Sequence, residues 1–222
     1  MVNLLIITCL LFDLGYIYCK KRQYNLCGFL CKSLAALSFI IIGLLACKDN
    51  QSSYCVAIVI GLVLDGLGDV FLAIRNFKKN IKWMILGGIM FMFGHLFYIG
   101  ALISQNTKEL YTLESIFISM GIILGNIFMK LIKDKLNLSK GYFLLGIIYC
   151  SLIFMVMTLS ICTYIDFQSL YKLIFLIGSI LFVGSDVILI LYNFGLKKEW
   201  MHPTYSLLYF IAQLLISYSL HL

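Results

Sequence analysis

Eight apolar stretches, each about as long as a membrane is thick, occupy almost the whole chain. A helix needs about 20 apolar residues to cross the hydrocarbon layer of a bilayer. Short connections, roughly 4 to 10 residues each, make successive helices antiparallel neighbours. The sequence therefore predicts an all-α polytopic membrane helix bundle, with eight transmembrane helices at roughly 2–19, 24–46, 54–74, 82–104, 112–132, 141–163, 170–192 and 203–221.

The composition excludes a soluble fold. Charged residues make up 12% of the chain, whereas a soluble domain has about 25%. No stretch between the expected spans is long enough to fold alone, so we expect one domain over residues 1–222. The apolar N-terminus lacks the basic segment that opens a signal peptide, and Lys20, Lys21 and Arg22 follow it instead. This order indicates a first span with a translocated N-terminus.

Basic residues gather in alternate connections, and they predict the orientation. The first, third, fifth and seventh connections with their flanks hold 13 of the 17 lysines and arginines. Because basic residues stay on the cytoplasmic side, both termini are expected to be non-cytoplasmic. The net charge of +7 then reflects topology and anionic lipid headgroups, and no nucleic acid partner is expected. The opposite connections hold only Lys48, Lys108 and Lys172, which are offset by Asp49, Glu109 and Asp166. The 13 basic residues are Lys20, Lys21, Arg22, Arg75, Lys78, Lys79, Lys82, Lys130, Lys133, Lys135, Lys140, Lys197 and Lys198.

Two segments four spans apart resemble each other. GLVLDGLGDVFL (61–72) aligns without gaps to GSILFVGSDVIL (178–189), and five of the twelve positions are identical. An offset of four spans is what two parallel four-helix repeats would give. Chance similarity between two apolar segments is the alternative.

Asp69 and Asp186 occupy equivalent positions in these two segments. Each lies about six residues, or about 9 Å, before the basic end of its span. If the two spans are neighbours, the carboxylates share one pocket, and a close pair in a low dielectric keeps one proton between them. That state suits acid–base hydrolysis. The alternative is two structural acids bonded to hydroxyl groups or to Lys32.

Further polar residues inside the spans are candidates for supporting roles. Lys32 is a counter-ion for the aspartates or a contact for a lipid phosphate, or its ammonium group reaches the interface. Asp65, one turn before Asp69, either tunes that carboxylate or extends a polar stripe. His95 is more typical of a hydrogen-bonded core residue than of a metal ligand. The remaining candidates are Tyr98, one turn after His95, and the line formed by Tyr205, Tyr209 and Gln213.

The eight cysteines are scattered along the apolar spans without a CxxC motif, so no zinc site is expected. Cys47 and Cys55 flank one short connection on the non-cytoplasmic side. The favoured interpretation is that they are small apolar residues at helix ends. Pairing in an oxidising compartment is the alternative.

The polar segments, taken in order, resemble the YhhN-like lysoplasmalogenase family of eight-span membrane proteins. Together with Lys32, they cover nearly the whole chain. Two positions depart from the family pattern: Ser33 stands where proline is usual, and Asp65 stands where a small polar residue is commoner. The matching stretches are GLVLDGLGDVFLAI (61–74), FMFGHLFYIGAL (91–102), GSILFVGSDVILILYNF (178–194) and PTYSLLYFIAQLLISYS (203–219).

The resemblance implies hydrolysis of the vinyl ether bond of lysoplasmalogens. The products would be a fatty aldehyde and glycerophosphoethanolamine or glycerophosphocholine. It also implies that Asp69 and Asp186 are the catalytic acids. The expected partners are a lysophospholipid substrate and membrane lipids, with no obligatory protein partner, no cofactor and no metal. Two alternatives stay open: a small proton-coupled membrane transporter, since intramembrane acids also mark transport pathways, and a catalytically inactive lipid-binding member of the family.

Overall fold

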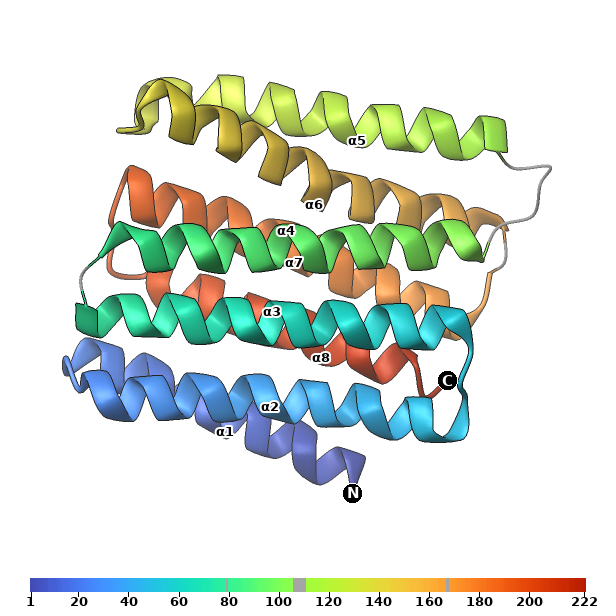
Figure 1. The fold of residues 1–222 in the computed structure, drawn as a ribbon, viewed down its shortest axis with the longest axis horizontal. Helices are drawn as coiled ribbons and strands as arrows, with labels where there is room; N and C mark the ends of the chain where they lie inside the picture. The colour runs from blue at the N-terminus through green and yellow to red at the C-terminus, as the bar shows by residue number, and fades with distance from the viewer. Residues whose placement is uncertain (79, 106–110, 167) are drawn as a thin grey trace.

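The computed structural model describes residues 1–78, 80–105, 111–166 and 168–222. Within these residues all regular secondary structure is helical (Figure 1). Helices occupy each of the eight predicted positions, so the all-helical fold class is confirmed. In chain order they are α1 (Val2–Lys21), α2 (Asn25–Asp49), α3 (Ser53–Lys78), α4 (Ile81–Ser104), α5 (Tyr111–Ile132), the short 3₁₀ helix η2 (Lys133–Lys135), α6 (Lys140–Asp166), α7 (Leu170–Phe194) and α8 (Met201–Ser219).

The helix ends follow from local chemistry. Pro203 falls in the first turn of α8. Backbone N–H groups in the first turn make no hydrogen bond within the helix, so a proline there, which has no N–H, breaks none. The side chain of Asn80 accepts a hydrogen bond from the backbone N–H of Lys82 at 2.9 Å and so caps α4. Helices α1, α3 and α5 carry basic residues in their last turns, which complement the negative end of the helix dipole.

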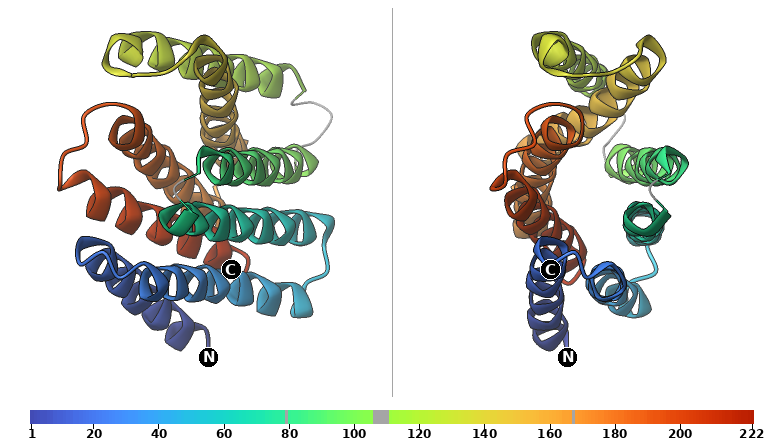
Figure 2. Two further views of the ribbon diagram at one scale, coloured as in Figure 1. Left: turned by 60° about the vertical axis from the view of Figure 1, so that its left-hand side comes forward. Right: turned by 90° about the vertical axis from the view of Figure 1, so that its left-hand side faces the viewer.

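Seven helices form a closed ring in the order α1, α2, α3, α4, α6, α7, α8 and back to α1 (Figure 2). Helix α5 packs against α6 from outside this ring. Successive helices were predicted to be neighbours, and this is wrong for α4 and α5, because both pack against α6, which separates them. Helix α8 also contacts α2 and α3 across the interior, so one of its faces lies inside the ring.

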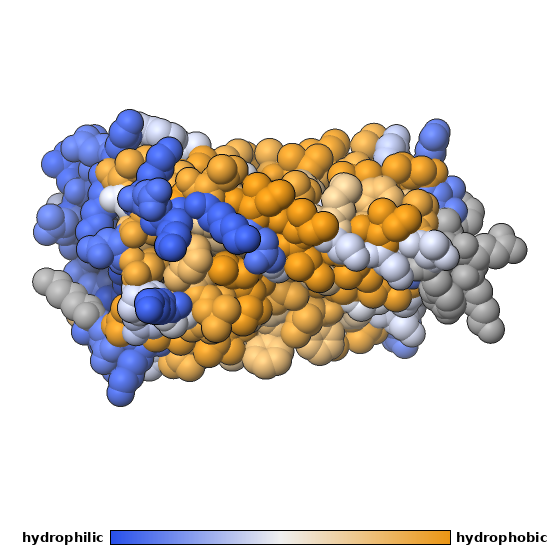
Figure 3. Space-filling model, turned by 90° about the horizontal axis from the view of Figure 1, so that it is seen from above, coloured by the Kyte–Doolittle hydropathy of each residue, from blue (hydrophilic) through white to orange (hydrophobic). Residues whose placement is uncertain are grey.

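Helices α1 to α7 are long and apolar enough to cross a membrane, which identifies a multi-pass membrane protein. Helix α8 is shorter, with 19 residues, and less apolar, because it turns buried polar side chains such as Ser206, Tyr209 and Gln213 to the interior. Figure 3 shows apolar surface along the middle of the molecule and hydrophilic surface gathered at one end.

The hydrophilic end is where the four predicted basic connections lie together (Figure 1). We call it the basic end. Of the charges used to predict orientation, Lys79, Lys108 and Glu109 lie outside the described residues. The orientation itself stays a prediction.

Glycines set how closely several helices approach. A Cβ on Gly68 of α3 would lie 2.8 Å from the ring of Phe91, and one on Gly87 of α4 would lie 3.0 Å from the carbonyl oxygen of Gly68. A Cβ on Gly121 or Gly125 of α5 would lie 2.6 Å from the backbone of α6. Close packing through glycine is therefore a property of the α3–α4 and α5–α6 pairs.

The proposed internal repeat gains support from two equivalent glycines. A Cβ on Gly61 of α3 would meet the ring of Tyr98 on α4, and a Cβ on Gly178 of α7 would meet Ile216 on α8 at 3.0 Å. The α3–α4 and α7–α8 pairs thus pack through matching positions. The packing of α4 on α6 likewise corresponds to that of α8 on α2.

Cys47 and Cys55 form a disulfide bond, so the favoured interpretation of these residues as unpaired is wrong. The short connection between α2 and α3 places the last turn of one helix against the first turn of the next. Their Cα atoms are 5.8 Å apart, within the range that a disulfide spans.

Candidate functional site

A cavity of about 510 Å³ lies inside the helix ring toward the basic end. Side chains from α1, α2, α3, α4, α7 and α8 form its wall. Its outermost part includes Lys197, an exposed residue of the α7–α8 connection. Asp69 and Asp186 both line this cavity, from α3 and α7 on opposite sides of the ring. The structure therefore brings the two acids to one site.

Asp69 is held by a cation and a hydroxyl group. The Lys32 ammonium lies 3.0 Å from its Oδ1, and Tyr209 donates a hydrogen bond to its Oδ2 at 2.7 Å. Both charged side chains are buried, at 8% and 1% exposure for Lys32 and Asp69. Lys32 is therefore a counter-ion, and the alternative in which it reaches the interface is wrong. Its ammonium also lies 5.5 Å from the ring centre of Tyr16.

Asp186 has a different environment. It accepts a hydrogen bond from the hydroxyl group of Tyr149 on α6. In the described part of the chain, no cation lies within 4 Å of its carboxylate oxygens. Both acids of the cavity thus accept a hydrogen bond from a tyrosine hydroxyl group, and they are distinguished by the ammonium group of Lys32, which pairs with Asp69.

Asp65 lies deeper, outside the cavity wall. Its Oδ2 accepts hydrogen bonds from Tyr98 at 2.8 Å and from the Gln213 side chain at 2.7 Å. Gln213 also donates to the Tyr209 hydroxyl group at 3.2 Å. A chain of buried polar groups therefore runs from Asp65 through Gln213 and Tyr209 to Asp69.

The remaining two predicted residues have different roles. His95 lies outside the cavity wall: its Nδ1 lies 2.6 Å from the carbonyl oxygen of Phe91, and its ring packs against Phe182. It is a core residue. Tyr205 lines the cavity, and its carbonyl oxygen accepts a hydrogen bond from Ser185 at 2.9 Å.

The sequence analysis missed Tyr149, the partner of Asp186, and the buried acid Asp13. Tyr149 is a polar residue in an otherwise apolar stretch, and no spacing links it to Asp186. Asp13 of α1 had no assigned role. It accepts a hydrogen bond of 2.5 Å from Ser206, which lines the cavity, so it fixes α1 against α8.

Basic side chains surround the outer part of the cavity. Lys20 donates a hydrogen bond to Asn76, and Arg75 donates one to Asn193 at 3.1 Å. These amide oxygens hold the cations against the wall without neutralising them. With Lys32 and Lys197, the wall holds four cations and two carboxylates. An anionic group such as a phosphate suits this opening.

A second, apolar cavity of about 150 Å³ adjoins the first. The two share Leu72, Phe91, Leu189 and Asn193 as wall residues. The apolar cavity extends between α4, α6 and α7, and its wall includes Leu145, which is 42% exposed. It therefore reaches from the polar cavity to the apolar outer surface. Tyr149, the partner of Asp186, also belongs to its wall.

Comparisons with known proteins identify the family of the chain. The YhhN family matches residues 28–220, which include all of α3 to α7 and the two acids of the cavity. Comparisons with curated proteins and with solved structures gave no match. The match covers far more than half of the chain, and the chain belongs to the YhhN family, the family of lysoplasmalogenases.

Proposed function

We propose that this protein hydrolyses the vinyl ether bond of lysoplasmalogens to a fatty aldehyde and a glycerophospho-headgroup. Family membership supports a lysoplasmalogenase-like function in general. The observation that carries the specific reaction is the asymmetry of Asp69 and Asp186, which line one cavity with different partners. Vinyl ether hydrolysis needs one acid that gives a proton and one carboxylate that accepts one.

The ion-pair and hydrogen-bond partners of the two acids indicate which one donates the proton and which one accepts it. The ammonium group of Lys32 stabilises the ionised form of Asp69, and Tyr209 adds a hydrogen bond to it. Asp186 lacks such a counter-ion among the described residues, and in a low dielectric an unpaired carboxyl group keeps its proton. We therefore assign Asp186 as the proton donor and Asp69 as the base.

The reaction then proceeds in three steps. Asp186 transfers its proton to the outer vinyl carbon, and the carbon bonded to oxygen becomes an oxocarbenium ion beside the Asp69 carboxylate. A water molecule attacks that carbon and gives a proton to Asp69, forming a hemiacetal. The hemiacetal hydroxyl group returns a proton to Asp186 and Asp69 protonates the glycerol oxygen, so the carbon–oxygen bond breaks and both acids recover their starting states.

The two cavities suit the two halves of the substrate. The phosphate group would contact the basic opening formed by Lys20, Arg75 and Lys197. The hydrocarbon chain would occupy the apolar cavity between α4, α6 and α7. The vinyl ether bond joins these halves, and it would then lie at the shared wall, near Tyr149 and Asp186.

The test is aldehyde release from lysoplasmenylethanolamine by purified wild-type, Asp69→Asn and Asp186→Asn proteins in detergent with EDTA. Each variant should lose about 100-fold or more in rate. Asp65→Asn is the matched control, because it alters a buried acid one turn from Asp69 that does not line the cavity, and its loss should be much smaller. A lysolipid with a saturated ether chain should stay intact, because it has no carbon–carbon double bond beside the ether oxygen that could accept the proton.

Full activity in either cavity variant would contradict the mechanism. Well-folded wild-type protein that releases no aldehyde, and leaves ester lysolipids untouched, would overturn the proposed activity. Substrate counterflow in liposomes would then test the transporter alternative. Transporter sites are typically built on interrupted helices, whereas α3 and α7 are continuous through Asp69 and Asp186.

A further inference from the structure

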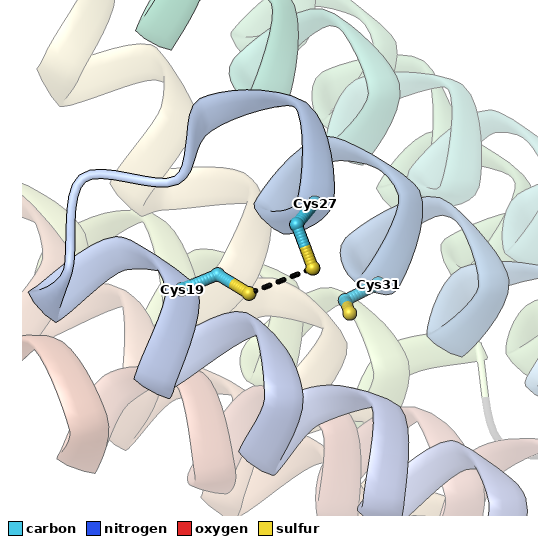
Figure 4. A group of neighbouring side chains, drawn as sticks. All are labelled: Cys19, Cys27 and Cys31. Atoms are coloured by element: carbon cyan, nitrogen blue, oxygen red, sulfur yellow. Dashed lines mark hydrogen bonds between the residues drawn. The ribbon is translucent and has the colours of Figure 1, made fainter.

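Three cysteines meet where α1 turns into α2 at the basic end (Figure 4). Cys19 lies in the last turn of α1, and Cys27 and Cys31 lie one turn apart on the same face of α2. The backbone N–H of Tyr24 donates a hydrogen bond of 2.8 Å to the carbonyl oxygen of Cys19, which closes the turn and brings α2 back against α1.

Two glycines allow the sulfur atoms to approach. A Cβ on Gly28 would lie 3.5 Å from the Cβ of Cys19, and a Cβ on Gly15 would lie 3.2 Å from the Sγ of Cys31. Because both residues are glycines and carry no Cβ, the two helices pack closely at the cysteines. The three Sγ atoms lie within 4.8 Å of one another, and those of Cys19 and Cys27 are 3.0 Å apart.

The arrangement fits three sulfur ligands around one metal ion. Metal–thiolate bonds of about 2.3 Å in a trigonal plane separate the sulfur atoms by about 4 Å. To reach that spacing, the Sγ atoms of Cys19 and Cys27 would have to separate from 3.0 Å to about 4 Å. All three cysteines are free, and Cys27 is exposed while Cys19 is buried, so an ion could enter at Cys27 and be enclosed at Cys19.

The ligand set selects the class of ion. Among the described residues, the cluster contains three thiols and no histidine, aspartate or glutamate. Zinc favours four ligands, whereas soft thiolates also select Cu(I). Three thiolates with Cu(I) carry a net charge of −2, and Lys20, Lys21 and Arg22 follow Cys19 directly in the sequence and can balance it.

We propose that Cys19, Cys27 and Cys31 form a three-thiolate site for one Cu(I) ion. On binding, each thiol releases its proton to solvent and forms a copper–sulfur bond, with no change in oxidation state. The site is separate from the carboxylate cavity, and its occupancy can be measured without any activity assay. Copper binding can therefore be tested independently of the proposed hydrolysis.

The experiment titrates the full-length, reduced protein in detergent with Cu(I) under anaerobic conditions, against a chromophoric Cu(I) chelator. One copper ion per chain should bind, and X-ray absorption spectroscopy should show that the atoms bonded to the copper are sulfur. Cys27→Ser and Cys31→Ser should each weaken binding by about 100-fold or more. Cys27→Ser is the safest variant for folding, because Cys27 is exposed.

The controls are Cys150→Ser and Cys162→Ser, which change free, buried cysteines outside the cluster and should leave copper binding unchanged. Equal loss of copper in these controls would overturn the site, as would unchanged binding in Cys27→Ser and Cys31→Ser. Displacement of Cu(I) by equimolar Zn²⁺ would overturn the choice of ion. A reduced protein that binds no copper, and that forms a Cys19–Cys27 disulfide when it is exposed to air, would show a redox pair instead.

Discussion

Lys32 of α2 and Asp69 of α3 form a buried ion pair, with Nζ and Oδ1 3.0 Å apart. Removing one partner leaves an unpaired charge in a low dielectric, which costs about 3–5 kcal/mol. Lys32→Met should therefore lower the free energy of unfolding by about that amount. The double variant Lys32→Met/Asp69→Asn removes both charges and should recover most of the stability but not the activity. Thermal unfolding in detergent, measured beside aldehyde release, separates these effects. A double variant as unstable as the single one would contradict the charge argument.

Tyr149→Phe should lower kcat with little change in KM. In the proposed reaction Asp186 becomes negatively charged as it gives up its proton, and the Tyr149 hydroxyl group stabilises that charge. A hydrogen bond to a charged group contributes about 1.5–3 kcal/mol, so the rate should fall about 10- to 100-fold. Tyr218→Phe makes the same chemical change outside the cavity and should leave kcat unaltered. Equal kinetics for the two variants would remove Tyr149 from the mechanism.

Gly88→Leu should shorten the chain length that the protein accepts. Gly88 lines the apolar cavity, and a Cβ placed there meets no atom within 4 Å, so a leucine side chain can extend into the cavity without disturbing α4. Turnover of long-chain lysoplasmalogens should fall relative to short-chain ones. Gly100→Leu is the matched control on the same helix, because its Cβ also meets open space but Gly100 is not part of the cavity wall. An unchanged chain-length profile in Gly88→Leu would show that the hydrocarbon chain binds elsewhere.

Gly125→Ala should destabilise the α5–α6 pair. The added Cβ would lie 2.6 Å from the Cα of Ser151, and backbone cannot move aside as a side chain can. Overpacking of this kind costs about 1–3 kcal/mol. Gly100→Ala, which meets open space, should be neutral or stabilising by less than about 1 kcal/mol. Thermal unfolding compares the two, and equal stability would mean that α5 shifts freely on α6.

The orientation can be tested with the cysteines at opposite ends of the bundle. If the basic end is cytoplasmic, a membrane-impermeant maleimide added to intact cells should leave the exposed Cys27 unlabelled. After mild reduction of the Cys47–Cys55 disulfide at the other end, the same reagent should label Cys47, which is only partly buried, whereas Cys55 is buried. Permeabilised cells give the positive control for Cys27. Labelling of Cys27 from outside intact cells would reverse the predicted topology.

Much of the fold could be predicted because a membrane imposes length and polarity on each helix separately. Runs of about 20 apolar residues located the helices, and the alternation of basic connections predicted that they would meet at one end. The pairing of Lys32 with the aspartates was also among the predictions, since a buried charge needs a partner.

Most successive helices are neighbours as predicted, but the contacts between helices that do not follow each other in the chain could not be predicted from the sequence. Tyr149 contacts Asp186 only because α6 joins α4 to α7 in the ring, with α5 displaced to the outside. The Cys47–Cys55 disulfide and the cluster around Cys27 depend in the same way on the turns at which helices fold back. Spacing along one helix carries no information about such contacts.

The contact between the polar and apolar cavities would decide where each product goes after cleavage. One cavity reaches the charged end of the bundle through Lys197, and the other reaches the lipid-facing surface beside Leu145. A lipid cut where the two meet would send its water-soluble half toward the aqueous phase and its aldehyde half into the bilayer. Each product would partition into the phase in which it dissolves, and the separation itself would oppose recombination.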